Sequence, residues 1–419
     1  MIKTKFALIT LIVTLAVIMT VFLRSSNFSR VASVTDSQKV WWEVQSIDTV
    51  KYSRDIAREK ANDVSFDLVI DKQVSLIAGT GATHIAIGTP YDAEFLPFMK
   101  RWVSTARKYG LKVWFRGNLA GWESWFGYPR ISKEEHIEKT KEFILSNGEL
   151  FEDGDVFSSC PECENGALGD PRLTGDVRGY RKFLIDEYKV TNDSFRKVGK
   201  NVRSNFIPMN GDVANLVMDK ETTKALGGIV VIDHYVATPE GLAADVKKIA
   251  QRSGGRVVLG EFGAPIPDIH GNFSELEQYI WVQDSLERLS EVNDLIGVNY
   301  WVSFGGSTKL WNDDGSERIV VGVLETFFKP KMLTGKIVNQ IQKPVEGAKV
   351  NVGIKTTITN ENGEFTIPYL SNEAMLKVEK DGYFQSQIAV GAVKGQIILI
   401  RNPENFIFKI EKFFFNLFK

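Results

Sequence analysis

Apolar and polar residues alternate along most of the chain in the manner of repeated βα units. From Val40 onward, short apolar runs end in polar residues and are followed by longer segments in which apolar residues recur three and four positions apart. This alternation predicts a parallel sheet covered by helices. The apolar runs that we interpret as strands are residues 41–50, 83–92, 112–122, 155–165, 201–212, 228–236, 256–265 and 295–306.

The number of these units favours a closed barrel. Eight βα units over residues 39–329 match a (β/α)8 barrel, which typically needs about 250 residues or more. An open, doubly wound sheet is the alternative, but it usually has fewer strands and a glycine-rich phosphate-binding turn after an early strand. The sequence has no such turn, so we predict an α/β fold of the TIM barrel type.

The first residues predict export and attachment to a membrane. A basic start, MIKTK, precedes an uncharged apolar run that ends at Arg24 and is long enough to span a bilayer as a helix. The residues after it lack the small-residue pattern of a cleavage site. We expect an uncleaved signal anchor over residues 1–24, a polar linker over residues 25–38, and an extracytoplasmic location at the cell surface for the rest. Cleavage and secretion is the alternative.

The pattern changes after residue 329. Residues 330–402 alternate apolar and polar positions in short runs broken by turn signals such as KDGYF, which predicts a small β-sandwich. The segments VEGAKVNV, TTITNENGEFTI and EKDGYF resemble those of carboxypeptidase regulatory-like, or prealbumin-like, domains, which implies an adhesive or spacing module. Residues 403–419 place aromatic residues at helical spacing among lysines. They predict an amphipathic helix for a membrane surface or for the protein's own surface.

Composition and charge argue against several classes of function. The formal net charge is -1, which gives no general attraction to nucleic acid. Two cysteines are too few for a disulfide framework or a four-thiolate zinc site. We therefore expect no nucleic-acid partner and no cofactor, and the sequence leaves the oligomeric state open.

Polar and aromatic residues gather at the C-terminal ends of the predicted strands. In a (β/α)8 barrel these ends form the face on which enzymes of this fold place their active sites. Any one such residue could simply begin a loop, but their recurrence over most of the strands favours a common site. The candidates for substrate binding are Asp92, Arg116, Asn118, Trp122, Trp125, Asn210, Asp212, His234, Tyr235 and Trp301.

Two glutamates at strand ends are candidates for catalysis. Glu261 follows an apolar strand and has glycines close by on both sides, whereas Glu162 lies in the sequence SSCPECENG at the end of the fourth strand. They lie 99 positions apart, or about 33 residues for each of three βα units, near the roughly 31 of an average barrel. Two carboxyl groups are sufficient to cleave a glycosidic bond, because one protonates the leaving oxygen and the other attacks the anomeric carbon.

The barrel resembles glycoside hydrolase clan A, the retaining (β/α)8 enzymes that include the family five cellulases and mannanases. PECENG is similar to the clan's NEPENG type of sequence, which implies that Glu162 is the acid/base, and GEFG implies that Glu261 is the nucleophile. The resemblance also implies that Tyr235 hydrogen-bonds the nucleophile and that Trp301 forms the floor of a sugar subsite. The sequence departs from the clan at Pro161, where the clan has an asparagine that donates to a sugar hydroxyl.

We therefore predict an extracytoplasmic retaining glycoside hydrolase whose substrate is a β-linked oligo- or polysaccharide. In the implied double displacement, Arg116 or Tyr235 keeps Glu261 ionised while Glu162 protonates the leaving oxygen. The tryptophans Trp122, Trp125 and Trp301 supply flat rings for stacking on sugars, whereas Trp114 lies inside an apolar strand and is assigned to the core.

Two other functions stay open at the level of the sequence. A non-catalytic glycan-binding protein of the cell surface is favoured by Pro161. A metal-dependent hydrolase would draw on Cys160, Cys163 and His234, although the sequence has no second C-x-x-C pair and no H-x-x-x-H pair.

Overall fold

The computed structural model describes residues 40–403. The predicted anchor at 1–24, the linker at 25–38, and the predicted tail from residue 404 onward lie outside this range. Within residues 40–403, no helix combines the length and the apolar character that a bilayer crossing requires.

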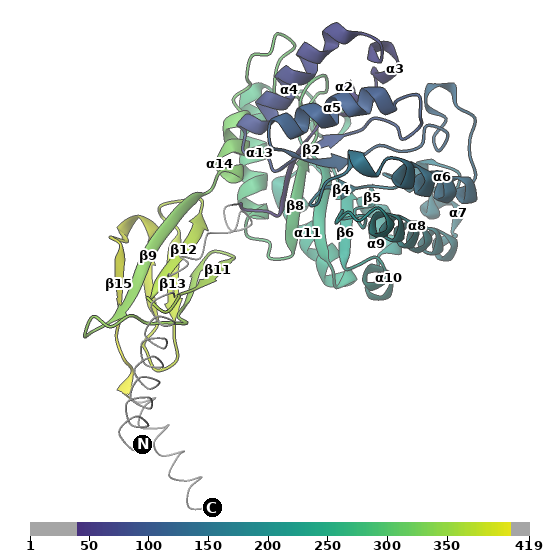
Figure 1. Ribbon diagram of the computed structural model, residues 1–419. Helices are drawn as coiled ribbons and strands as arrows, with labels where there is room; N and C mark the ends of the chain where they lie inside the picture. Colours follow the sequence, from purple (N-terminus) through teal and green to yellow (C-terminus); the bar gives the residue numbers. More distant parts are fainter. Residues whose placement is uncertain (1–39, 404–419) are drawn as a thin grey trace, which may run out of the picture. The chain divides into compact units, whose positions relative to one another are not determined.

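Eight parallel strands form one sheet in the first part of the described chain (Figure 1), in the order β4-β3-β2-β1-β8-β7-β6-β5. Each lies inside one of the segments predicted from the sequence, so the predicted α/β fold with an eight-stranded, barrel-like parallel sheet is confirmed. The strands are β1 (Val44–Asp48), β2 (His84–Ile87), β3 (Lys112–Phe115), β4 (Val156–Phe157), β5 (Pro208–Asn210), β6 (Ile229–Asp233), β7 (Arg256–Phe262) and β8 (Leu295–Tyr300).

The two ends of this sheet meet through the backbone near β4 and β5. Val156 forms a parallel bridge with Arg203, and the Phe157 N–H donates to the Arg203 carbonyl at 3.0 Å. Further along, the Glu162 N–H donates to the Pro208 carbonyl at 2.8 Å. These few contacts close the sheet into a barrel.

Helices surround the barrel strands (Figure 1). Several begin and end where the sequence carries capping residues: α6 and α13 start with capping boxes at Ser132 and Ser274, and α11 ends at Gly254 with φ of 64°. The helices are α2 (Val50–Ser53), α3 (Ala57–Lys60), α4 (Asp67–Gly79), α5 (Leu96–Lys108), α6 (Lys133–Ser146), α7 (Pro171–Thr174), α8 (Val177–Lys197), α9 (Gly211–Val217), α10 (Lys220–Ala225), α11 (Pro239–Ser253), α12 (Pro267–His270), α13 (Glu275–Leu289) and α14 (Val321–Phe328).

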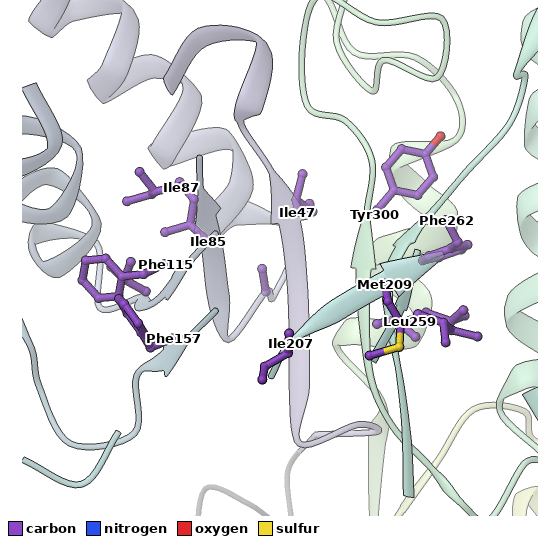
Figure 2. Close-up of a cluster of buried hydrophobic side chains, with 14 of the residues drawn as sticks. Ile47, Ile85, Ile87, Phe115, Phe157, Ile207, Met209, Leu259, Phe262 and Tyr300 are labelled. Atoms are coloured by element: carbon purple, nitrogen blue, oxygen red, sulfur yellow. The ribbon is translucent and has the colours of Figure 1, made fainter. Parts of the chain in front are cut away.

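Side chains on the barrel strands are divided between two hydrophobic clusters. The larger cluster joins strand residues such as Ile47, Ile85 and Phe115 to apolar residues of the helices, and Figure 2 shows part of it. The smaller cluster takes its members from the strands and the segment before β5, and includes Trp114 and Val231. Because side chains alternate along a strand, this second cluster is the barrel interior. Trp114 is fully buried there, as predicted.

The last part of the described chain forms two further sheets, with strand orders β11-β10-β13-β14 and β12-β9-β15. Apolar side chains from both sheets, among them Val350, Leu376, Ile367 and Ile397, form a hydrophobic cluster of their own. The predicted C-terminal β-sheets are therefore present, while the resemblance to carboxypeptidase regulatory-like domains stays a prediction. The strands are β9 (Lys331–Asn339), β10 (Lys349–Val352), β11 (Lys355–Ile358), β12 (Glu364–Tyr369), β13 (Met375–Glu379), β14 (Ser386–Ala389) and β15 (Gln396–Leu399).

Candidate active site

A buried arginine gathers three carboxylates at the C-terminal end of the barrel. Arg116 lies two positions after the interior residue Trp114, and only 5% of its side chain is exposed. Its guanidinium group contacts Asp48 at 3.5 Å, Asp233 at 2.9 Å and Glu261 at 2.8 Å. Burial lowers the pKa of Arg116, but the adjacent carboxylates outweigh this effect and raise the pKa above its ordinary value. The arginine therefore remains a fixed positive charge.

An irregularity in β7 turns Glu261 toward this arginine. The pairing of β7 with β6 is regular up to Leu259, but Asp233 then pairs with Glu261, so Gly260 is an extra residue. Such bulges redirect side chains beside active sites. Gly260 has no room for a side chain, because a Cβ there would lie 2.4 Å from an Asp233 carboxylate oxygen. Its carbonyl accepts a hydrogen bond from Arg116.

Two donors orient the carboxylate of Glu261. The Arg116 Nη2 donates to Oε1 and the Tyr235 hydroxyl donates to Oε2, each at 2.8 Å. Burial raises the pKa of Glu261 to about 7, the charges of Asp48 and Glu162 add to this rise, and Arg116 and Tyr235 oppose it. Glu261 is thus held in one orientation and titrates near neutral pH.

Asp233 is a buried acid of the cluster. Burial raises its pKa well above the ordinary value, and Arg116 only partly opposes this rise. Arg116 therefore faces three carboxylates with a single positive charge.

Glu162 lies in a tight turn after β4. Its backbone is left-handed, with φ of 47°, a conformation that costs a residue with a side chain about 1 kcal/mol or more and that is concentrated at functional sites. The Asn165 Nδ2 donates to Glu162 Oε2 at 3.2 Å. Cys160 and Cys163, which flank the glutamate, are both fully buried and are joined by a disulfide.

The second glutamate of the motif holds this turn in place. Glu164 is buried and accepts hydrogen bonds from the Tyr180 hydroxyl and from the Asn210 N–H, each at 2.8 Å. Burial raises the pKa of Glu164. Glu164 connects the turn to α8 and to the end of β5, so it fixes the position of the turn that carries Glu162.

Glu162 and Glu261 line the same cavity, which has a volume of about 190 Å³. Trp125 lines it too, with the Arg54 guanidinium 4.6 Å from the centre of its ring. Trp301 is half-buried and lies edge-on to Tyr235, with ring centres 6.1 Å apart. The other residues that line the cavity are Asp48, Val50, Arg54, Gly88, Arg116, Glu123 and Pro161.

Three predicted site residues instead support the loop after β3. Trp122 is fully buried, stacks on Phe183 with ring centres 5.3 Å apart, and donates to the Cys163 carbonyl. No face of its ring is open to a sugar, so we remove Trp122 from the candidate site. Asn118 is buried against His136. Asp92 accepts a hydrogen bond from a backbone N–H of the same loop, and burial raises its pKa.

Three further predicted site residues have other places in the structure: a helix cap, an exposed position and an ion pair. Asn210 caps α9 by accepting from the Asp212 N–H at 3.1 Å. The Asp212 side chain is 77% exposed and faces solvent. His234 contacts Asp245 through Nε2 at 2.9 Å and packs on Gly211, where a Cβ would lie 2.3 Å from its Nδ1. None of these three side chains lines the cavity that holds the two glutamates.

The sequence-based prediction did not include four charged residues of the site. Asp48 and Asp233 contact Arg116, whereas Arg54 and Glu123 line the cavity. Asp48 and Asp233 each end an apolar strand, which is the signal that identified the other candidates. Arg54 and Glu123 lie in loops and carry no comparable signal. Within residues 40–403, no group of three or more His, Cys, Asp or Glu side chains is arranged to hold a metal ion.

No protein-family model matches the chain, and no curated protein matches it in sequence. Among solved structures, a GH5_18 glutamate-to-alanine variant from Bifidobacterium longum subsp. longum ATCC 55813, in complex with Manβ1-4GlcNAc, has a TM-score of 0.51 and 13% identity over 73% of this chain and 86% of that one. A corresponding GH5_18 variant from Streptomyces cattleya with the same disaccharide has a TM-score of 0.51 and 12% identity over 71% and 84% of the two chains. The chain shares the barrel fold of these GH5 proteins. At such low identity the similarity shows the fold alone.

Proposed function

We propose that the protein is a retaining glycosidase that cleaves β-linked glycans, with Glu162 as acid/base and Glu261 as nucleophile. The observation that carries this proposal is that the two glutamates, delivered by the ends of β4 and β7, line one cavity. The similarity in fold to GH5 proteins supports it, because two of those structures hold a β1-4-linked disaccharide. Two carboxyl groups at one site are sufficient for glycosidic bond cleavage.

In the first half of the reaction, Glu261 attacks the anomeric carbon and the bond to the leaving oxygen breaks. Arg116 and Tyr235 each bind one oxygen of Glu261, so the attacking carboxylate needs no reorientation. Burial raises the pKa of Tyr235 well above 10, which keeps its hydroxyl a donor. The proton of Glu162 passes to the leaving oxygen.

In the second half, water attacks the same carbon and displaces Glu261. Glu162 now accepts a proton from that water, so the enzyme returns to its starting protonation state. Asp233 takes no part in either transfer, because it is buried beneath Arg116. Its role in this scheme is to accept hydrogen bonds from Arg116 and so to orient that side chain.

The aromatic residues provide places for sugar rings. Trp125 lines the cavity, and the Arg54 guanidinium lies 4.6 Å from the centre of its ring. Trp301 is half-buried beside Tyr235, which binds the nucleophile. Stacking on such rings favours pyranoses with an apolar face.

The test is a panel of aryl β-glycosides and β-linked polysaccharides assayed with the wild-type protein and with Glu162→Ala and Glu261→Ala. Proton NMR of the first product gives its anomeric configuration, and we expect retention. A 2-fluoro glycoside of the preferred sugar should label Glu261, which peptide mass mapping detects. The matched control is Glu134→Gln, whose side chain is 72% exposed on α6. Inversion of configuration, or labelling of another residue, would contradict the proposed roles.

A non-catalytic glycan-binding protein is the second candidate function. It is favoured by Pro161, which lines the cavity and offers no side-chain donor where clan A enzymes have an asparagine. Calorimetric binding of a β-linked oligosaccharide that survives in Glu261→Gln, with no turnover by the wild type, would support this candidate over catalysis.

We also propose that the catalytic part acts outside the cytoplasm, anchored by residues 1–24. The support is the apolar run and its basic flank in the sequence. Protease treatment of intact cells that express the full chain tests this location, because an exported barrel is degraded while a cytoplasmic one is protected.

A further inference from the structure

A third glutamate, Glu123, lines the cavity that holds the two proposed catalytic groups. It is half-buried in the loop after β3. The residue before it, Trp122, is buried and donates to the Cys163 carbonyl. Two residues after it, the Trp125 N–H donates to the Ala120 carbonyl at 2.8 Å. The loop is therefore fixed on both sides of Glu123.

The order of the barrel strands places Glu123 beside the proposed acid/base. The strand before it, β3, is the neighbour of β4, which Glu162 follows, and lies four places from β7, which carries Glu261. In a closed barrel of eight strands, strands four places apart lie opposite each other. Asn165 joins the neighbouring glutamates, because its Nδ2 donates to Glu162 Oε2 at 3.2 Å and its side chain also hydrogen-bonds Glu123. Glu123 thus lies on the side of Glu162 and across from Glu261.

This side of the cavity is where the leaving group of the proposed reaction must lie. The nucleophile attacks the anomeric carbon from the face opposite the bond that breaks, so the leaving oxygen points away from Glu261 and toward Glu162. A side chain next to Glu162 is therefore next to the sugar that leaves. Trp125 lines the cavity from the same loop as Glu123, and an aromatic ring with a carboxyl group can bind both the apolar face and the hydroxyl groups of a sugar.

Glu123 retains hydrogen-bond acceptor sites for a ligand. A carboxylate has about four acceptor sites, whereas the donors of Asn165 are divided between Glu123 and Glu162. Burial raises the pKa of Glu123 to about 7, the charges of Glu162 and Glu164 add to this rise, and Arg54 opposes it. At pH 8 the Glu123 side chain is therefore mainly an ionised acceptor.

The charges that line the cavity are mostly negative. Four acidic side chains and two arginines line it. The arginines are already paired, because Arg116 binds Asp233 and Glu261 and Arg54 binds Asp55 at 2.9 Å. A sugar that brings its own carboxylate would meet this negative charge, whereas a neutral sugar brings hydroxyl donors.

We propose that Glu123 is a specificity-determining residue that accepts hydrogen bonds from the hydroxyl groups of the leaving-group sugar, so that the enzyme takes glycans with a neutral sugar in that position and rejects those with a uronic acid. This inference rests on the proposed glycosidase function. Glu123 takes no part in the proton transfer or in the bond changes at the anomeric carbon. It binds the sugar whose oxygen Glu162 protonates.

The test compares three substrates that share the glycone preferred by the wild-type protein: its β1-4 disaccharide with glucose as the leaving sugar, its β1-4 disaccharide with glucuronic acid, and its benzyl β-glycoside. Benzyl alcohol needs protonation to leave, as a sugar does, but carries no further hydroxyl group. We expect Glu123→Ala to lower kcat/KM about 30-fold for the glucose disaccharide and less than about threefold for the benzyl glycoside. The matched control is Glu134→Gln, for which we expect no change.

Glu123→Gln tests the selection by charge. Glutamine keeps the shape of the side chain and an acceptor oxygen but removes the negative charge. Wild type should prefer the glucose disaccharide to the glucuronic acid disaccharide at pH 8. We expect the ratio of the two kcat/KM values to fall about tenfold in this variant. An unchanged ratio would contradict the selection by charge.

Two results would overturn the inference while leaving the proposed function intact. An equal loss on the glucose disaccharide and the benzyl glycoside would show that Glu123 supports the loop or the acid/base instead of binding the sugar. An unchanged kcat/KM for the glucose disaccharide in Glu123→Ala would show that Glu123 does not contact it.

Absence of turnover by the wild type on all three substrates would count against the proposed function itself. Calorimetric binding of cellobiose and of Manβ1-4GlcNAc then decides the role of Glu123. Weaker binding by Glu123→Ala than by wild type supports contact with the sugar, and equal binding, or no binding by either protein, overturns it.

Discussion

We expect Glu261, the proposed nucleophile, to destabilise the folded protein, so that its replacement by glutamine makes the protein more stable. Burial raises the pKa of Glu261 from the ordinary glutamate value of 4.5 to about 7, and its side chain is 20% exposed. The folded state therefore binds this proton more tightly than the unfolded chain does. The contribution of Glu261 to the free energy of unfolding is fully present below pH 4.5 and is lost progressively as the pH rises toward 7.

The magnitude follows from the difference between the two pKa values. Each pH unit of difference corresponds to about 1.4 kcal/mol, so the ionised Glu261 costs about 3 kcal/mol at pH 8 and about 1 kcal/mol at pH 5. Glu261→Gln keeps the shape and an acceptor oxygen but loses the charge, at the expense of about 1 kcal/mol of charge-assisted hydrogen bonding to Arg116. We expect a net gain of about 2 kcal/mol in the free energy of unfolding at pH 8 and about none at pH 5.

Urea unfolding at pH 5 and pH 8 measures this difference, with Glu134→Gln as the control for a change of charge on an exposed side chain. The same Glu261→Gln variant should lose about 10³-fold or more in kcat, because the attacking carboxylate is gone. A loss of stability at pH 8, or a gain that is equal at both pH values, would refute the reasoning. A loss at pH 8 would mean that Arg116 fully compensates the charge of Glu261, and an equal gain at both pH values would mean that the gain does not come from the ionisation of Glu261.

Three further outcomes are expected of the proposed enzyme. The kcat/KM of wild type should rise with pH through about 7 as Glu261 ionises, which a pH profile on one aryl glycoside measures. Tyr235→Phe removes a hydrogen bond that lowers the pKa of Glu261, so this acidic limb should move to higher pH and kcat should fall about tenfold. Trp125→Ala should raise KM about tenfold with little change in the unfolding midpoint, which steady-state kinetics measures. Trp122→Ala, at a fully buried position, should instead lower the free energy of unfolding by about 3–5 kcal/mol. Urea unfolding of the two variants separates these effects.

The strands of the barrel could be predicted from the sequence because each is buried on both faces and ends in polar residues. Their lengths could not. Residues 201–212 were expected to form one strand, but only Pro208–Asn210 do so, and β4 has two residues. In both segments the polar residues near the apolar run belong to turns, and periodicity does not distinguish a strand end from the turn that follows it.

The candidate site was predictable where the fold itself brings residues together. The carboxyl ends of parallel strands converge on one face, so Arg116, Glu162 and Glu261 meet. Trp122 and Trp125 lie in one loop and could not be distinguished in the sequence. In the structure Trp122 is buried, whereas Trp125 lines the cavity. The backbone path that separates them depends on left-handed residues that no local pattern specifies.

The irregularity in β7 was also invisible in the sequence. The run RVVLGEFG alternates too weakly to show that Gly260 is an extra residue. Its effect appears only when Asp233 and Arg116 occupy the space that a side chain at Gly260 would need. Packing between strands, rather than the pattern within one strand, decides the direction of Glu261.

Because few backbone hydrogen bonds join β4 to the segment before β5, this part of the barrel is held less firmly than the part around β7. Glu261 stands on β7, a strand of seven residues paired on both sides, whereas Glu162 follows β4, which has two residues and meets its neighbour through a few backbone contacts. Amide hydrogen exchange should therefore be fast along this seam and slow along β7. If Glu162 and Glu261 have the roles proposed above, the acid/base stands on the less firmly paired part of the barrel, while the attacking carboxylate stands on β7 beside the arginine that binds it.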